Sequence, residues 1–234
     1  MEDNGTNAVG GALQFSQLPT ERQAEYRKAA SQMVRLAQAC AIPIIFAPPL
    51  SAGGTPNGAT GCVLELGDAT FVVTAAHVLS GYEDGIQAGQ TLNWQVGALP
   101  PFDPLSRVAW RDNATDIVFL ALSATEARVA CGNSSHIVSA SSGWPPPCPQ
   151  VEQLVLVSGY PKILREVESS GRIGAGPYSA MFRVTSVGEG YFNCQIEQRD
   201  LVSFDETALP PPDTDMGGVS GGPVLLDLGI TWGK

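Results

Sequence analysis

A glycine-rich run near the end of the sequence is the feature that most constrains how this chain can fold. Residues 217–223 read Gly-Gly-Val-Ser-Gly-Gly-Pro, with Ser220 as the serine. Glycine adopts backbone conformations that other residues avoid, so the run predicts a sharp turn that exposes the Ser220 hydroxyl and brings amide N–H groups to one side. A tight turn between two strands would use the same residues, so the run alone does not separate a catalytic turn from a structural one.

Two further segments carry groups that can activate a serine. Thr-Ala-Ala-His-Val at 74–78 follows an apolar run and contains His77, and Asp116 opens the apolar stretch 117–122. Serine is a poor nucleophile near neutral pH, so it needs a general base such as a histidine, which a carboxylate in turn orients. The chain therefore contains a candidate nucleophile, base and orienting carboxylate.

Each of these residues has an alternative interpretation. Asp116 stands where a residue that only caps a turn before a strand would also stand. Asp112 is the alternative carboxylate, but it lies outside the apolar stretch. His136, the second of the two histidines, lies in a polar segment, where we expect a surface residue.

Taken together, the three motifs, in the chain order His77, Asp116, Ser220, resemble the trypsin-like serine proteases of the chymotrypsin fold. In that family the histidine follows Thr/Ser-Ala-Ala, the aspartate opens an apolar strand, and the serine lies in Gly-x-Ser-Gly-Gly-Pro. The resemblance implies a serine endopeptidase that works through a Ser-His-Asp triad and an acyl-enzyme, with the amides of Gly218 and Ser220 as the oxyanion hole. Val219 replaces the aspartate of relatives that are activated by cleavage, so the chain looks like a bacterial-type member without zymogen activation.

The resemblance also implies an all-β fold of two antiparallel, six-stranded β-barrels, with the catalytic groups in the cleft between them. The organisation that we expect has four parts that make one protease domain: an N-terminal extension with one helix at 1–40, the first barrel at 41–125, a connection at 126–150 and the second barrel at 151–234. Thr20 to Gln23 reads as a capping box that opens the helix, whose apolar stripe would pack on a barrel. Docking of a partner through this helix is the alternative.

Substrate recognition is read from two segments that flank the serine turn. By the resemblance, the floor of the primary specificity pocket falls at Thr214 and Asp215, where a buried carboxylate would favour a basic side chain. Asp215 pointing into solvent is the alternative. Thr231, Trp232 and Gly233 resemble the strand that pairs with the substrate backbone, so we expect a peptide or protein substrate bound by strand addition.

The composition indicates which classes of partner and which cellular compartment to expect. A net charge of -10 disfavours nucleic acid and anionic membrane surfaces as partners. The acidic start Met1–Asn4 lacks the features of a secretory signal, and five scattered cysteines suggest neither a disulfide framework nor a metal site. We therefore expect reduced cysteines, a cytoplasmic setting, and no metal or cofactor.

The C-terminal end of the sequence argues for a competing function. The chain ends at Lys234, whereas members of the family continue through another strand that walls the pocket. The second barrel is therefore expected to be incomplete at its C-terminus, and the activity of this chain to be weak. The alternative function is a catalytically silent, protease-like module that binds peptides or docks to a partner. An esterase with the same triad ranks lower, because esterases carry their serine on a strand–turn–helix elbow.

Overall fold

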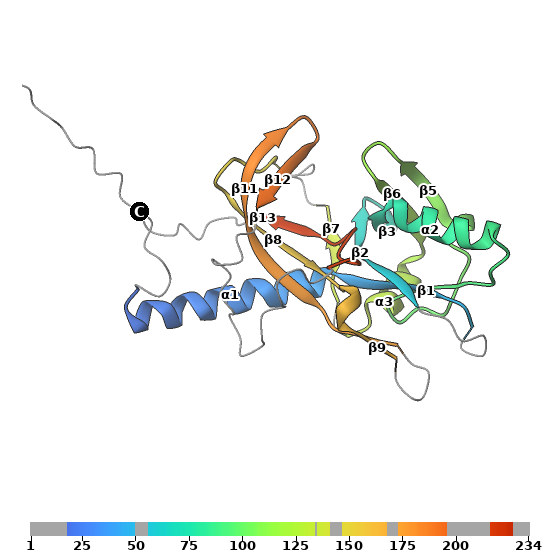
Figure 1. Ribbon diagram of the computed structural model, residues 1–234, viewed down its shortest axis with the longest axis horizontal. Coiled ribbons are helices and arrows are strands. Elements are labelled where there is room, and N and C mark those ends of the chain that lie inside the picture. Colours follow the sequence, from blue (N-terminus) through green and yellow to red (C-terminus); the bar gives the residue numbers. More distant parts are fainter. Residues whose placement is uncertain are drawn as a thin grey trace, which may run out of the picture.

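The computed structural model describes residues 18–49, 56–133, 135–140, 147–167, 173–195 and 216–226. The larger of its sheets is built from strands in which buried side chains alternate with more exposed ones, as expected where one face covers a core. Its strands run antiparallel in the order β4-β1-β2-β3-β6-β5, and β7 adds to β2 in parallel (Figure 1). The bounds are β1 Ile42–Ala47, β2 Asn57–Leu66, β3 Ala69–Ala75, β4 Asn93–Val96, β5 Val108–Asp112, β6 Ile117–Leu122 and β7 Ile137–Ser139.

The core of the larger sheet holds the first catalytic candidates in position. Helix α2, Ala76–Gln87, follows β3 without a break and buries Val78, Leu79 and Tyr82. The Tyr82 ring packs edge-on against Trp94 of β4, with ring centroids 5.4 Å apart, and Trp94 in turn stacks on Phe46 of β1. Such aromatic contacts fix the orientation of the helix relative to the sheet.

The second sheet is smaller and contains the strand that follows the glycine-rich run. Its order is β12-β11-β8-β13, all antiparallel, with β8 Leu154–Gly159, β11 Tyr178–Gly188, β12 Tyr191–Gln195 and β13 Val224–Leu226. A separate two-stranded sheet pairs β9, Arg165–Val167, with β10, Ile173–Ala175. In Figure 1 the red turn before β13 lies against β2 and β3, so the two main sheets meet at the serine.

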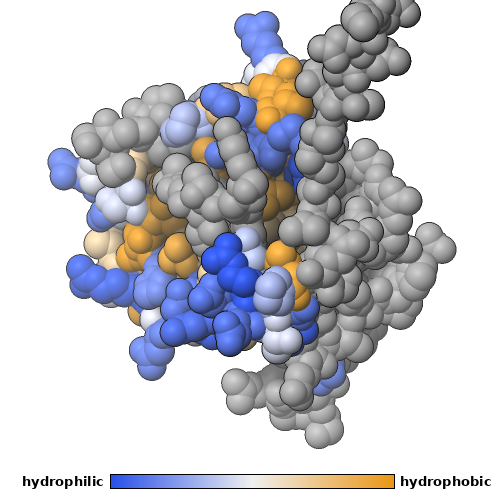
Figure 2. Space-filling view, turned by 90° about the vertical axis from the view of Figure 1, so that its left-hand side faces the viewer, coloured by the Kyte–Doolittle hydropathy of each residue, from blue (hydrophilic) through white to orange (hydrophobic). Residues whose placement is uncertain are grey.

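The N-terminal helix α1, Thr20–Cys40, packs against β8 and β11 of the second sheet, where it buries Ala30 and Ala37. The side of the molecule that carries this helix and sheet shows apolar surface bordered by hydrophilic groups (Figure 2). The predicted capping box at Thr20 is wrong. Pro19 occupies the N-cap position, no side chain caps the helix, and Nε2 of the Gln23 side chain donates instead to the Leu18 carbonyl at 2.8 Å.

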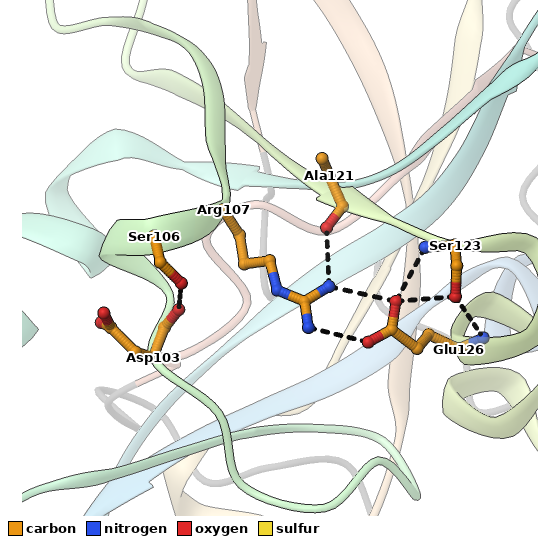
Figure 3. Close-up of polar contacts among 6 residues, drawn as sticks. All are labelled: Asp103, Ser106, Arg107, Ala121, Ser123 and Glu126. Atoms are coloured by element: carbon orange, nitrogen blue, oxygen red, sulfur yellow. Dashed lines mark hydrogen bonds and ion pairs between the residues drawn. The ribbon is translucent and has the colours of Figure 1, made fainter.

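A capping box that was not predicted opens the short helix α3, Ala124–Cys131. Figure 3 shows its polar contacts: the Ser123 hydroxyl accepts from the Glu126 amide, and the Glu126 carboxylate accepts from the Ser123 amide. Arg107, in the 3-10 turn η3 at Leu105–Arg107, donates to both oxygens of that carboxylate, at 2.8 and 3.0 Å. The segment predicted as a connection, 126–150, therefore contains the end of α3 as well as β7.

The prediction of a predominantly β protein is confirmed in this coarse form. Among the described residues, however, none of the sheets closes into a barrel. The apolar runs 61–66 and 70–74 on either side of Gly67-Asp68 predict one hairpin, and Gly188-Glu189-Gly190 between 178–187 and 191–198 predicts another. Both are present, as β2–β3 and β11–β12, with a positive φ at Gly67 and Gly190. What the fold provides for function is a junction, where the end of β3, the start of β6 and the turn before β13 come together.

Candidate active site

His77 lies at the point where β3 passes into α2. Buried residues on both sides, Ala76 and Val78, hold this segment, while the His77 side chain remains 58% exposed. Because Ala75 at the N-cap position makes no side-chain cap, the first amide N–H groups of the helix need acceptors from elsewhere. The exposed imidazole is therefore presented to solvent from a rigid backbone.

Asp116 supplies those acceptors and also contacts the imidazole. Its carbonyl oxygen accepts from the Ala76 amide at 3.0 Å, and its Oδ1 accepts from the His77 amide at 2.8 Å. Its Oδ2 lies 2.7 Å from Nδ1 of the His77 ring. A carboxylate at a helix N-terminus is favoured by the helix dipole, so one residue both caps α2 and orients the ring.

The environment of Asp116 keeps its carboxyl ionised. Partial burial by itself would raise the pKa of Asp116, but the hydrogen bonds from the His77 ring and amide outweigh it, so the pKa is lowered. An ionised carboxylate accepts a hydrogen bond from Nδ1–H, which leaves Nε2 of a neutral ring free to accept a proton. Asp116 has a φ of 55°, a left-handed conformation that Asp and Asn adopt more readily than most residues.

Arg111 of β5 joins the helix to the strand pair that carries Asp116. Its Nη1 donates to both carboxylate oxygens of Glu83, at 3.0 and 2.9 Å, and its Nη2 donates to Ser80 Oγ at 2.7 Å. Both acceptors lie on α2, while Arg111 pairs with Val118 of β6. These bonds from Arg111 to two residues of α2 therefore resist separation of His77 from Asp116.

The glycine-rich run forms a turn in which two amides have no partner among the described residues. Gly218 and Gly221 have φ values of 100° and 82°, which other residues rarely adopt. The Gly222 amide donates to the Val219 carbonyl at 2.9 Å, and the Val219 amide donates to the Met216 carbonyl at 3.3 Å. Within the described part of the chain, the amides of Gly218 and Ser220 donate no hydrogen bond. The turn therefore has two available N–H donors, one on each side of Val219.

Thr60 of β2 connects this turn to the rest of the molecule. Its amide donates to the Ser220 carbonyl at 3.1 Å, and its Oγ1 donates to the Gly218 carbonyl at 2.7 Å. The same Oγ1 accepts from the Tyr160 amide at 2.8 Å, and the Thr60 carbonyl accepts from Thr74 Oγ1 at 2.6 Å. Thr60 has no exposed surface, so these bonds lie in a dry environment, where each is strong and costly to lose.

Packing around Gly221 places the turn that carries Ser220 against the end of β3, the strand that leads to His77. A Cβ on Gly221 would collide with Thr60 O and Thr74 Oγ1, and it would lie 2.7 Å from the Ala75 amide nitrogen. The residue after Ser220 is therefore in direct contact with the backbone two residues before His77. Among the described residues, no hydrogen bond joins Ser220 Oγ to the His77 ring.

The other predicted site residues divide into two groups. Thr214, Asp215, Thr231, Trp232 and Gly233 lie outside the described residues. Asp112, the alternative carboxylate, contacts its own turn, where its oxygens accept from the Ala114 amide at 2.9 Å and the Thr115 hydroxyl at 2.8 Å. These contacts, the Ala114 bond first, lower the pKa of Asp112. His136 is exposed, as expected.

Sequence reasoning missed Thr60 and Arg111, because nothing in their local sequence shows which distant residues they contact.

The five cysteines are free, as expected. Burial raises the pKa of the Cys62 thiol to about 12, with a smaller effect from Cys40. The described residues contain no group of three or more His, Cys, Asp or Glu side chains that could hold a metal ion. In those same ranges, no helix has the length and apolar character that a membrane span requires.

Comparison with known proteins adds no family assignment. Neither a protein-family model nor a curated protein matches this chain.

Proposed function

We propose that this protein is a serine endopeptidase of the trypsin-like type, with His77, Asp116 and Ser220 as its triad. The observation that carries the proposal is the junction described above. The His77–Asp116 pair and the Ser220 turn come from different sheets, yet both rest on the end of β3. In this proposal the two main sheets correspond to the two barrels of that family. The motif order in the sequence supports the same assignment.

The proposed reaction follows from the hydrogen bonds at each group. Nε2 of His77 takes the Ser220 hydroxyl proton as Oγ attacks the carbonyl carbon, and Asp116 stabilises the imidazolium that forms. The amides of Gly218 and Ser220 donate to the oxyanion, which then collapses and expels the amine with the proton from His77. Water, deprotonated by the same ring, releases the acyl group and regenerates the serine.

A catalytically silent peptide-binding module is the second candidate. The observation that favours it is the absence, in the described residues, of a hydrogen bond between Ser220 Oγ and the His77 ring. Catalytic hydrogen bonds are often long without substrate and tighten when it binds, so this observation alone does not remove the first candidate. The two candidates differ in the reactivity of Ser220, which can be measured directly.

Labelling with a fluorophosphonate tests the proposal, because this reagent modifies only serines that are activated as nucleophiles. We expect the wild type to be labelled at Ser220, and Ser220→Ala to abolish labelling. Ser106→Ala, which removes an exposed serine of η3, is the matched control and should be labelled like the wild type. Absence of labelling in folded wild type would reject the protease and leave the peptide-binding module.

A further inference from the structure

An arginine lies directly against the serine turn. Arg165 is the first residue of β9 and follows η4, Lys162–Leu164. Its guanidinium lies between two glycines, Gly58 of β2 and Gly218 of the turn. A Cβ on Gly58 would lie 2.9 Å from Cζ and 3.0 Å from Nη1, and a Cβ on Gly218 would collide with Nη2. The guanidinium therefore occupies space that only glycine at both positions leaves open.

Arg165 is partly buried but has no carboxylate partner among the described residues. Nη2 donates to the Tyr160 carbonyl at 3.0 Å, which uses one of the five N–H donors of the guanidinium. Burial lowers the pKa of Arg165, although arginine stays protonated at neutral pH. Among the described residues its other donors have no protein partner, and none of these nitrogens is a fully buried, unpaired atom, so they remain open to solvent and to a ligand.

Three other arginines of the chain form ion pairs with carboxylates. Arg107 bonds Glu126, Arg111 bonds Glu83 and Arg183 bonds Glu152, each within 3.0 Å. The chain as a whole has 23 acidic residues against 13 basic ones, so carboxylates are plentiful. Glu166 directly follows Arg165 in the sequence, yet no ion pair joins the two among the described residues.

We propose that Arg165 binds an acidic side chain of the substrate next to the bond that Ser220 attacks. The protein would then prefer peptides with Asp or Glu close to the scissile bond. A carboxylate matches the planar fork of a guanidinium, and one that arrives with the substrate would satisfy the donors that the folded chain leaves open. This inference rests on the proposed protease function, because Gly218 defines the site only if Ser220 is the nucleophile.

Matched peptides test the preference. A parent substrate is first identified by sequencing the products of casein digestion, and Glu and Gln are then compared at each of the three positions on either side of the cleaved bond. We expect kcat/KM to favour Glu over Gln by about 10-fold to 100-fold at one of these positions, as for a hydrogen bond between charged groups. Arg165→Gln should bring this ratio close to 1, and Arg165→Lys should keep part of it.

Arg183→Gln is the matched control, because it removes an exposed arginine of β11 that bonds Glu152 and should leave the ratio as in the wild type. The fluorophosphonate reagent carries no acidic side chain, so it separates the two proposals. Labelled wild type with a Glu/Gln ratio of 1 at all six positions would overturn the role of Arg165 and leave the protease standing. Unlabelled wild type would overturn the protease itself. Where the wild type is labelled, fluorescence anisotropy of the same Glu and Gln peptides with Ser220→Ala measures the preference without catalysis, and equal affinities would also reject the role of Arg165.

Discussion

The two parts of the candidate site differ in how the fold holds them. His77 and Asp116 adjoin two strands of one sheet, β3 and β6, which pair over six consecutive residues, and α2 is anchored by buried aromatic rings. The Ser220 turn precedes β13, which has only three residues, all paired with β8. Its position depends on main-chain contacts, chiefly those to Thr60 of the other sheet and a bond of 2.7 Å from the Lys162 amide to the Gly217 carbonyl.

This difference predicts where in the molecule a substitution should change catalysis. The histidine and its carboxylate are organised within one sheet, so their geometry should survive changes elsewhere in the molecule. The nucleophile and its two amides are positioned by contacts between sheets, so small changes at that junction should reduce catalysis. The following predictions test this contrast, from the largest expected effect to the smallest.

Asp116→Asn should reduce kcat by about 10⁴-fold while the protein remains folded. Asn keeps the acceptor for the His77 amide and tolerates the φ of 55°, but its amide group would donate to Nδ1. The ring would then carry its proton on Nε2 and could no longer accept the serine proton. Steady-state kinetics and thermal unfolding measure the two effects. Asp112→Asn is the control, and a comparable loss of kcat there would make Asp112 the orienting carboxylate.

Gly221→Ala should cost about 10³-fold in kcat/KM, because the added methyl group would push the turn away from β2 and β3. The atoms that it would meet, Thr60 O and the Ala75 amide nitrogen, are backbone and cannot turn aside. Gly67→Ala is the matched control: its φ is also positive, at 59°, but nothing lies within 4 Å of the new atom. It should cost about 1–2 kcal/mol of stability and leave kcat/KM unchanged. Equal activity in the two variants would show that the junction does not position Ser220.

Thr60→Val should lower kcat by about 10-fold to 100-fold, because the Gly218 carbonyl loses its donor and the turn that carries both oxyanion amides loosens. It leaves the Tyr160 amide without its acceptor as well, so we expect stability to fall by about 2–4 kcal/mol. The rate of fluorophosphonate labelling reports the first effect, and urea unfolding the second. Thr70→Val, a buried threonine of β3 remote from the turn, serves as control and should retain the labelling rate.

Local patterns in the sequence were sufficient to predict the hairpins and part of the site. The apolar runs on either side of the Gly67-Asp68 turn predict β2 and β3, and the apolar stretch after Asp116 predicts β6. The His77–Asp116 contact was predicted from the resemblance of their motifs to a known family, and the two residues are in contact. The catalytic roles of these residues stay predictions.

What the sequence did not predict depends on contacts between distant residues. Thr60 looks like any threonine in a strand, and its four hydrogen-bond partners lie in three other segments. Helix α2 was missed because the apolar run before His77 continues into it without a break or a local cap, and the cap comes from Asp116. Closure of the sheets into barrels was expected from family resemblance alone, and no local pattern in the strands requires it.

The smallest effect is expected at Glu126, which lies at the other end of β6 from Asp116. The hydrogen bonds from Arg107, followed by those from Ser123, lower the pKa of Glu126 from 4.5 to about 2 (Figure 3). Because the folded state holds this carboxyl ionised, its contribution to stability is complete above pH 4.5 and is lost as the pH falls towards 2. The side chain is 32% exposed, so solvent screening limits the contribution to about 1–2 kcal/mol.

Glu126→Gln isolates the charge, since glutamine at this position can still accept from the Ser123 amide in the capping box. In urea unfolding, the variant should be about 1–2 kcal/mol less stable than the wild type at pH 7, and the difference should shrink as the pH falls from 4.5 towards 2. At pH 7 its kcat/KM should equal that of the wild type, because the larger sheet holds His77 and Asp116 with contacts that do not involve Glu126. A difference in stability that does not change with pH would assign the effect to packing. A fall in kcat/KM would show that the positions of His77 and Asp116 depend on contacts along the whole of β6. The His77–Asp116 pair would then be as sensitive to distant changes as the Ser220 turn.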